Sequence, residues 1–142
     1  MNISAKTEYA CIAVLELAVH AGSEKPVRIR DIAQANGIPA RFLVQILLQL
    51  KGAGIVTSTR GSAGGYQLAR DPAELSLGEV MAIIEGQTHE LTTNVSRETI
   101  ASRTLLRAWQ EVAAVQRDML HSTTFAELIS RVRGQTEAMY YI

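Results

Sequence analysis

The chain has 142 residues, of which 47% are hydrophobic, enough for one small domain and one appended element. Basic and acidic residues are equal at 14 each, so the net charge indicates no particular partner. The single cysteine excludes an internal disulfide and an all-cysteine metal site, and the apolar runs are too short to span a bilayer. We therefore expect a cytoplasmic protein that binds no membrane.

The distribution of charge is more informative than its sum. Residues 1–70 carry eight basic and four acidic side chains, whereas residues 71–142 carry six and ten. A basic first half on a neutral protein favours an anionic partner that approaches from one side.

Two helices are expected in the first part of the chain. Residues 6–20 are apolar on nearly every side, which predicts a mostly buried helix. The segment 27–35 spaces Ile29, Ile32 and Ala33 with a helical period, which predicts a short helix before a glycine turn.

A third helix is expected from Pro39 to Lys51, because proline is favoured at the first helical position and glycines follow Lys51. Its inward stripe is Leu43, Ile46, Leu47 and Leu50, and its opposite face is Arg41, Val44, Gln45, Leu48 and Gln49. Whether Leu48 faces solvent or packs on the first helix stays open. Two short helices joined by a turn with glycine predict a helix-turn-helix.

After this helix the apolar period changes to two. Strands are expected over 55–59 and 66–69, and the segment between them, 60–65, is rich in glycine and begins with Arg60. A hairpin with such a tip, directly after a helix-turn-helix, predicts a wing.

The second half is expected to be helical. A capping box at Ser76–Glu79 starts a helix that ends at Gly86, residues 87–102 are expected to form an exposed loop, and a long helix is expected from Thr104. That helix carries the spacing of a coiled-coil seam, at Leu105, Trp109, Val112, Gln116 and Met119. A second capping box at Thr124 predicts a short final helix.

The exposed face of the third helix has the chemistry of base recognition. Arginine can bond guanine bidentately and glutamine can bond adenine, so Arg41 and Gln45 are the predicted base readers, and Val44 is suited to a thymine methyl. Arg60 suits a narrow minor groove. The predicted DNA contacts are Arg28, Pro39, Arg41, Phe42, Gln45, Lys51, Arg60, Gly61, Ser62, Gly64, Gly65 and Tyr66. The alternative is a winged helix that contacts proteins, with its arginines merely solvated.

The sequence resembles the Rrf2 family of bacterial winged-helix transcription regulators over most of its length. The resemblance rests on Tyr9-Ala10, Ile32-Ala33, Gly37-Ile38, the run FLVQ at 42–45, the wing RGSAGGYQLAR at 60–70, the run LGEV at 77–80, and Trp109. It implies a homodimer held by the long helices, with one winged helix on each half-site of a near-palindromic operator. Many members hold a glutamate where this chain has Val44, so no base preference is carried over.

The resemblance also implies what the chain lacks. Sensor members of the family bind an iron-sulfur cluster through three cysteines in the loop that matches 87–102, and this loop has none. His89, Glu90 and Glu98 are a poor set for such a cluster, so we expect no cofactor and no metal. Cys11, on an apolar helix, is interpreted as core packing rather than a redox element.

We therefore expect an α+β, mainly α protein, with a winged helix-turn-helix domain over 1–71 and a helical dimerisation and effector region over 72–142. No nucleophile, phosphate-loop or carboxylate-pair motif indicates an enzyme. The predicted function is a homodimeric, sequence-specific DNA-binding repressor. The alternative is a protein-interaction or small-ligand-sensing module with secondary DNA binding. A third possibility is that the loop over 87–102 folds over a small ligand between the long helices.

Overall fold

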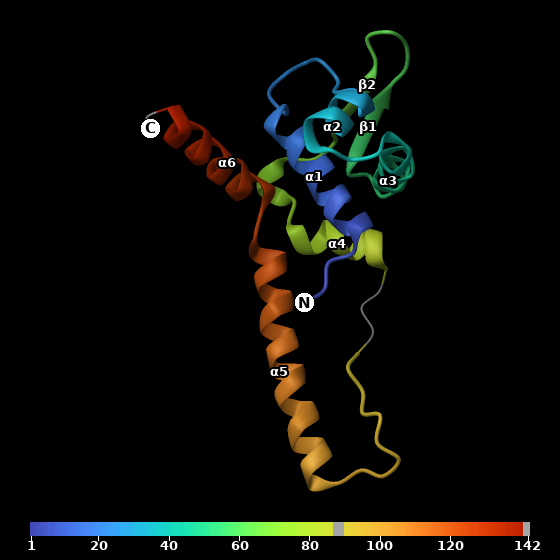
Figure 1. Cartoon of the computed structure of the whole chain (residues 1–142), viewed down its shortest axis with the longest axis vertical. Coiled ribbons are helices and arrows are strands. Elements are labelled where there is room, and N and C mark those ends of the chain that lie inside the picture. The colour runs from blue at the N-terminus through green and yellow to red at the C-terminus, as the bar shows by residue number, and fades with distance from the viewer. Residues whose placement is uncertain (87–89, 141–142) are drawn as a thin grey trace.

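The computed structural model of the chain describes residues 1–86 and 90–140, without the side chains of 139 and 140. The elements are α1 (Ala5–Val19), α2 (Ile29–Asn36), α3 (Ala40–Gly52), β1 (Val56–Thr59), β2 (Gly65–Leu68), the 3-10 helix η1 (Pro72–Glu74), α4 (Leu77–Glu85), α5 (Ile100–Ser122) and α6 (Phe125–Tyr140). This order confirms the predicted fold class, a mainly helical winged helix-turn-helix. Figure 1 shows the other elements gathered at one end, with α5 extending away from them.

The core is built around α1. Its side chains at Ala10, Ala13 and Val14 are fully buried, and α2, α3, α4 and α6 all pack against this helix. The core continues into the second half of the chain through Val80 of α4 and Phe125 of α6. The helix-turn-helix is therefore supported from behind by elements that follow the wing.

The turn between α2 and α3 follows the sequence pattern. Gly37 ends α2 in the left-handed conformation with φ of 65°, which glycine adopts without steric cost. The predicted inward stripe of α3 is confirmed, since Leu43, Ile46, Leu47 and Leu50 are at most 1% exposed. The second helix begins two residues later than the predicted segment, at Ile29.

Val27 lies outside α2 because it pairs with the wing. Its N–H donates to the Tyr66 carbonyl (2.9 Å) and its carbonyl accepts from the Tyr66 N–H (2.8 Å), so the segment before α2 lies along β2. On its other side β2 pairs antiparallel with β1, in a register that places Val56 opposite Leu68. The hairpin is thus joined to the helix-turn-helix by backbone hydrogen bonds.

The starts of α4 and α6 are joined to each other. One half of each predicted capping box is confirmed: Ser76 accepts from the Glu79 N–H (3.2 Å), and Thr124 accepts from the Glu127 N–H (3.2 Å). The carboxylates of Glu79 and Glu127 instead pair with Arg70 and Arg131. The backbones on either side of the caps also bond, with the Phe125 N–H donating to the Leu75 carbonyl at 2.9 Å. The final helix, expected to be short, has 16 residues.

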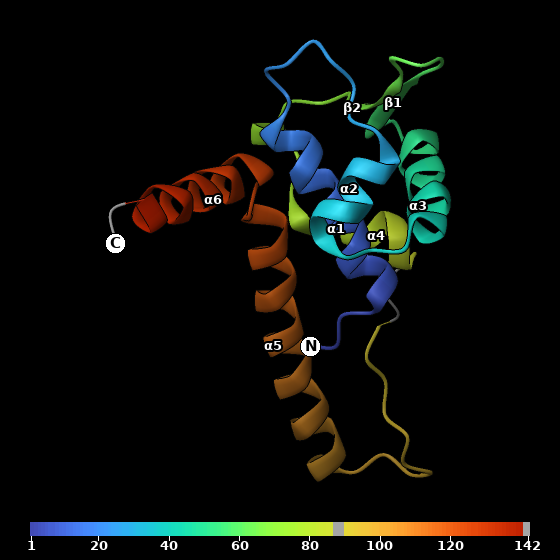
Figure 2. The same cartoon turned by 45° about the horizontal axis from the view of Figure 1, so that its top comes forward.

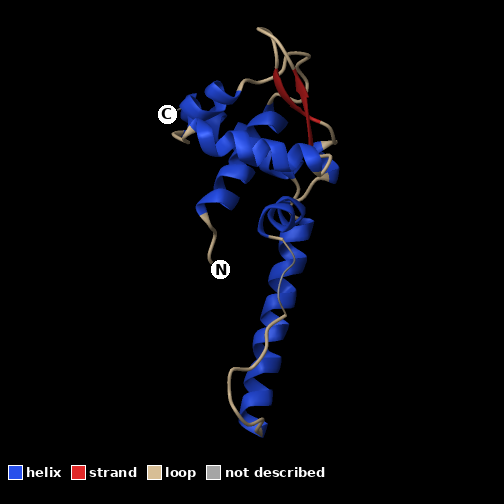
Figure 3. Ribbon diagram, turned by 90° about the vertical axis from the view of Figure 1, so that its right-hand side faces the viewer, coloured by secondary structure: helices blue, strands red, loops and turns tan. Residues whose placement is uncertain are grey.

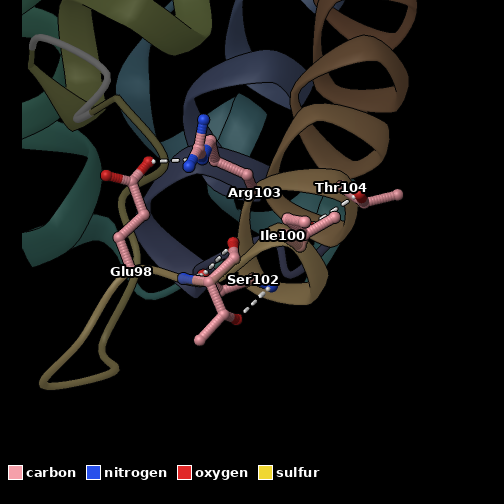
Figure 4. Close-up of polar contacts among 6 residues, drawn as sticks. Glu98, Ile100, Ser102, Arg103 and Thr104 are labelled. Atoms are coloured by element: carbon pink, nitrogen blue, oxygen red, sulfur yellow. Dashed lines mark hydrogen bonds and ion pairs between the residues drawn. The ribbon is translucent and has the colours of Figure 1, made fainter.

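The long helix α5 begins at Ile100, four residues earlier than expected, because Thr99 caps it. The Ser102 N–H donates to Thr99 Oγ1 (3.1 Å) and the Thr99 N–H donates to Ser102 Oγ (2.9 Å), a reciprocal box that Figure 4 shows beside the ion pair of Arg103 with Glu98. The loop before α5 runs along the helix (Figure 3), and the Gln110 side chain donates to the Leu91 carbonyl at 3.2 Å. Residues 87–89 of the expected loop, including His89, lie outside the described residues.

Candidate nucleic-acid interface

The outer face of α3 is open to solvent. Arg41, Val44, Gln45 and Leu48 are all exposed, and their spacing of three or four residues places them on one side of the helix, opposite the buried stripe. Leu48 therefore faces solvent and does not pack on α1. Gln49 does not belong to this face: its side-chain amide donates to the Ile83 carbonyl at 2.9 Å, which ties α3 to α4.

Two aromatic rings, tilted against each other, lie beside the first turn of α3. The guanidinium carbon of Arg41 lies 5.0 Å from the centroid of the Phe42 ring, a cation–π distance. The Phe42 ring in turn lies 6.0 Å from the ring of Tyr9 in α1. The Phe42 ring thus lies between Arg41 and α1 and is still 42% exposed, so its contact with DNA stays a prediction.

The other predicted contacts from the helices flank this face. Arg28 and Pro39 are the residues that immediately precede α2 and α3, and both are exposed. Lys51, in the last turn of α3, donates from Nζ to Ser58 Oγ in β1 at 2.6 Å. The Lys51 ammonium is thereby held between the helix and the base of the wing, where it adds positive charge.

The tip of the wing divides into exposed and internal residues. Arg60, Gly61 and Ser62 are exposed, whereas Gly64 is buried and its N–H donates to the Gly61 carbonyl at 3.0 Å. A Cβ on Gly64 would lie 2.1 Å from the Thr59 carbonyl oxygen, so only glycine fits this tight turn. Gly64 therefore shapes the wing, and the first residues of the tip are the ones that a ligand can reach.

The last two predicted wing contacts lie within β2 and are half-buried. Gly65 has φ of 155°, and a Cβ there would lie 2.4 Å from the Val27 carbonyl oxygen. The backbone N–H of Tyr66 is already donated to Val27. These two residues connect the wing to the segment before α2.

In Figure 2, α2, α3 and the wing lie on the side of the molecule away from the free end of α5.

The predicted dimer seam lies on a different element. Leu105, Trp109, Val112 and Met119 are 53–70% exposed, and Gln116 is also exposed. None of the residues of α5, all of which the structure describes, is buried. The apolar stripe of α5 is therefore left unburied by residues 1–86 and 90–140.

Three of the seam residues, Trp109, Val112 and Gln116, also line a groove of about 1040 Å³ across which α5 faces α4 and the loop. Met81 and Glu85 of α4, Leu91 of the loop, and Leu106 and Arg117 of α5 are among the side chains that line it. At its end α5 approaches α4 closely, since a Cβ on Gly78 would lie 2.5 Å from His121 Nδ1. The groove combines apolar walls with charges of both signs.

Cys11 lies on the core side of α1 and is partly buried. Burial, with a smaller contribution from the negative charge of Glu85, raises the pKa of this thiol from 9.0 to about 11. The thiol is protonated at neutral pH and is a weak nucleophile and a weak ligand.

Within residues 1–86 and 90–140, no three His, Cys, Asp or Glu side chains lie close enough to hold a metal ion. In the same ranges no helix is long and apolar enough to cross a membrane.

Comparison with known proteins agrees with this architecture. The sequence model of the Rrf2 family, described as an iron-dependent transcriptional regulator, matches residues 3–131. The chain is 34% identical to the transcriptional regulator CymR of Bacillus subtilis over 143 residues, covering all of both chains. It is 30% identical to the regulator IscR of Vibrio cholerae over 131 residues, which cover 91% of this chain and 75% of IscR.

A solved structure shares the fold as well. The structure of CymR, the global cysteine regulator of B. subtilis, superposes with a TM-score of 0.80 and 31% identity, and the match covers 92% of this chain and 98% of CymR. The predicted resemblance is thus confirmed over nearly the whole chain, in sequence and in structure. The chain belongs to the Rrf2 family and is a helix-turn-helix transcriptional regulator that binds DNA.

Proposed function

We propose that the protein is a homodimeric repressor that binds a near-palindromic operator in a sequence-specific manner. The observation that carries this proposal is the face of α3 described above, which is exposed and lies opposite the buried stripe, together with the exposed tip of the wing. A major groove admits one helix, and the helix must offer base-reading side chains on its free face. A dimer bound to an operator sterically excludes other proteins from that DNA, which is the proposed basis of repression.

The contacts divide by their chemistry. Arg41 reads a guanine and Gln45 an adenine through the major groove. Arg28, Lys51 and the backbone of Gly61 and Ser62 bind phosphates, which positions the helix but carries no sequence information. Arg60, at the start of the wing tip, enters the neighbouring minor groove, where the negative potential favours a guanidinium.

The proposed dimer uses the apolar stripe of α5. Its exposed side chains need a partner surface, and a second copy of the same helix supplies one that is equally apolar. In a twofold dimer each winged helix meets one half-site, so the operator is expected to repeat its sequence in inverted order.

We propose that this regulator works without an iron-sulfur cluster. Such clusters are held by several thiolates, and the only cysteine of the chain is Cys11 in α1, whose thiol is protonated at neutral pH. The loop before α5 contributes no cysteine. The protein is therefore expected to be colourless when purified aerobically and when purified anaerobically.

The proposal is tested by selecting bound duplexes from random and genomic DNA with the full-length protein, at two salt concentrations. We expect an inverted repeat to be enriched, and its affinity to fall steeply as salt rises, because bound phosphates release counterions.

Variant proteins test the roles of single side chains. Arg41→Ala should lower the binding free energy by about 1–3 kcal/mol through the loss of recognition at one base position. Lys51→Ala should weaken binding to all duplexes alike and lower the slope of affinity against salt by about one. Arg133→Ala and Lys6→Ala, which remove exposed charges on α6 and α1, are the matched controls. A footprint unchanged by Arg41→Ala contradicts the base-reading role.

The groove between α4 and α5 supports a second candidate, a ligand-sensing or protein-interaction module with secondary DNA binding. Its volume of about 1040 Å³ is of the size that small-molecule sites occupy. Salt dependence separates the two functions, since an apolar interface does not weaken as salt rises. If no duplex is enriched at either salt concentration, the second candidate is favoured.

A further inference from the structure

The DNA-facing side of α3 is half apolar. Val44 is 43% exposed and Leu48 is 57% exposed, and their separation of four positions places them one turn apart on the same side of the helix. Arg41 and Gln45 lie on that side too, so the apolar pair is interleaved with the two proposed base readers. Val44 and Leu48 together offer an apolar surface to whatever binds this face of α3.

The floor of the major groove offers one apolar group, the C5-methyl of thymine. We infer that Val44 and Leu48 bind thymine methyls, so that each operator half-site carries thymines beside the base pairs read by Arg41 and Gln45. This inference rests on the proposed function and adds to it the composition of the half-site. Phosphates and the polar edges of the other bases offer no comparable surface to an aliphatic side chain.

The helix geometry limits where the thymines lie. One helical turn advances about 5.4 Å, and successive base pairs are about 3.4 Å apart. Two side chains one turn apart therefore reach base pairs that are one or two steps apart. We expect two thymines within two steps of each other in each half-site, on either strand, because both strands present their methyls in the major groove.

A DNA occupant fits this patch better than a protein one because of what surrounds it. The flanking side chains are a guanidinium, Arg41, and an amide, Gln45, and Lys51 lies two turns from Val44 along the same helix. The patch is thus continuous with a basic and polar surface that complements nucleic acid. An apolar protein partner would have to bury the Arg41 charge or leave it unpaired.

The test removes single methyl groups from DNA. A duplex selected by the full-length protein is resynthesised with one thymine at a time replaced by deoxyuridine, which keeps every hydrogen-bonding group and deletes only the methyl. Loss of one buried methyl should weaken binding by about fourfold at each sensitive position. We expect one or two sensitive positions in each half-site, and insensitivity at every thymine outside them.

The variant proteins assign those positions to side chains. Val44→Ala should bind the thymine and deoxyuridine duplexes equally at one position, and Leu48→Ala at the other, because the side chain that touched the methyl is gone. Alanine favours the helix at both sites, so folding is preserved. Val132→Ala, a valine of α6 that is 37% exposed, is the matched control and should keep the full fourfold discrimination.

Each outcome decides the question. A selected duplex in which no thymine is sensitive, or in which sensitivity persists in both alanine variants, overturns the inference and leaves the proposed function intact. A patch that binds protein instead would leave DNA affinity unchanged in both variants, which overturns it as well. If no duplex is selected at all, the proposed function fails and the inference falls with it.

Discussion

Replacing Trp109 with alanine should separate the two subunits of the proposed dimer. Trp109 lies in the middle of α5 and is 60% exposed, although tryptophan is among the residues that most favour burial in interfaces. Neighbouring seam residues, Leu105 and Val112, flank it on the same stripe. If a second α5 covers this stripe, Trp109 contributes the largest apolar area in it.

The magnitude follows from that area. A tryptophan presents roughly 200 Å² of side-chain surface, so 60% exposure leaves roughly 120 Å² for a partner to cover. At about 25 cal/mol per Å² this area is worth about 3 kcal/mol, and twofold symmetry places two copies in one interface, about 6 kcal/mol in total. Since alanine keeps part of this contact, we expect the dimer dissociation constant to rise about a thousandfold.

Sedimentation equilibrium of the full-length protein over a range of concentrations measures this constant. Alanine favours the helix, so the circular dichroism of the variant should match that of the unaltered protein. Arg107→Ala changes an exposed residue of α5 two positions away, on another side of the helix, and should leave association unchanged. A Trp109→Ala protein that dimerises as tightly as the unaltered one refutes the seam.

Three further changes test the wing, the core and the thiol. Gly64→Ala places a Cβ 2.1 Å from the Thr59 carbonyl oxygen, so DNA binding should fall while helical content is retained, and Gly52→Ala, whose Cβ meets nothing, should bind normally. Phe125→Ala removes a side chain that is 0% exposed and should lower the free energy of unfolding, measured in urea, by about 3–5 kcal/mol. Cys11, with its pKa raised to about 11, should be alkylated at pH 8 about a hundredfold more slowly in the folded protein than in urea. An equal rate in both states contradicts that shift. The pKa of the Cys11 thiol is higher in the folded protein than in the unfolded one. The contribution of this thiol to the free energy of unfolding is therefore intact below pH 9 and declines between pH 9 and about 11.

Local sequence patterns predict most of the fold, because each of those elements is determined by residues close together in the chain. The apolar period of α3 identifies its buried stripe correctly, and the caps at Ser76 and Thr124 locate the starts of α4 and α6. The early start of α5 also has a local signal, since Thr99 and Ser102 cap each other. That pair differs from the usual box, which ends in glutamate or glutamine, so the usual pattern does not identify it.

The features that the sequence does not predict depend on distant partners. The apolar pattern assigns Val27 to a helix, but its backbone pairs with Tyr66. This pairing depends on the position of the wing, which the local sequence does not indicate. Gln49 is polar, which predicts a position on the exposed face, yet its amide donates a hydrogen bond to the Ile83 carbonyl near the end of α4. In the site, the exposure of Leu48 and the contact of Phe42 with Tyr9 depend in the same way on how α1 crosses α3.

The two proposed interfaces differ in what determines them. The DNA-binding face is defined within one chain, because the core fixes which side of α3 is buried and therefore which side is free. The seam on α5 is defined differently: its apolar side chains have the period of a buried stripe, and none of the described residues, 1–86 and 90–140, buries them. The sequence can name the seam residues, but their register against a partner is set by contacts between chains. Measuring dimerisation therefore tests a part of the function that base-recognition experiments on α3 leave untouched.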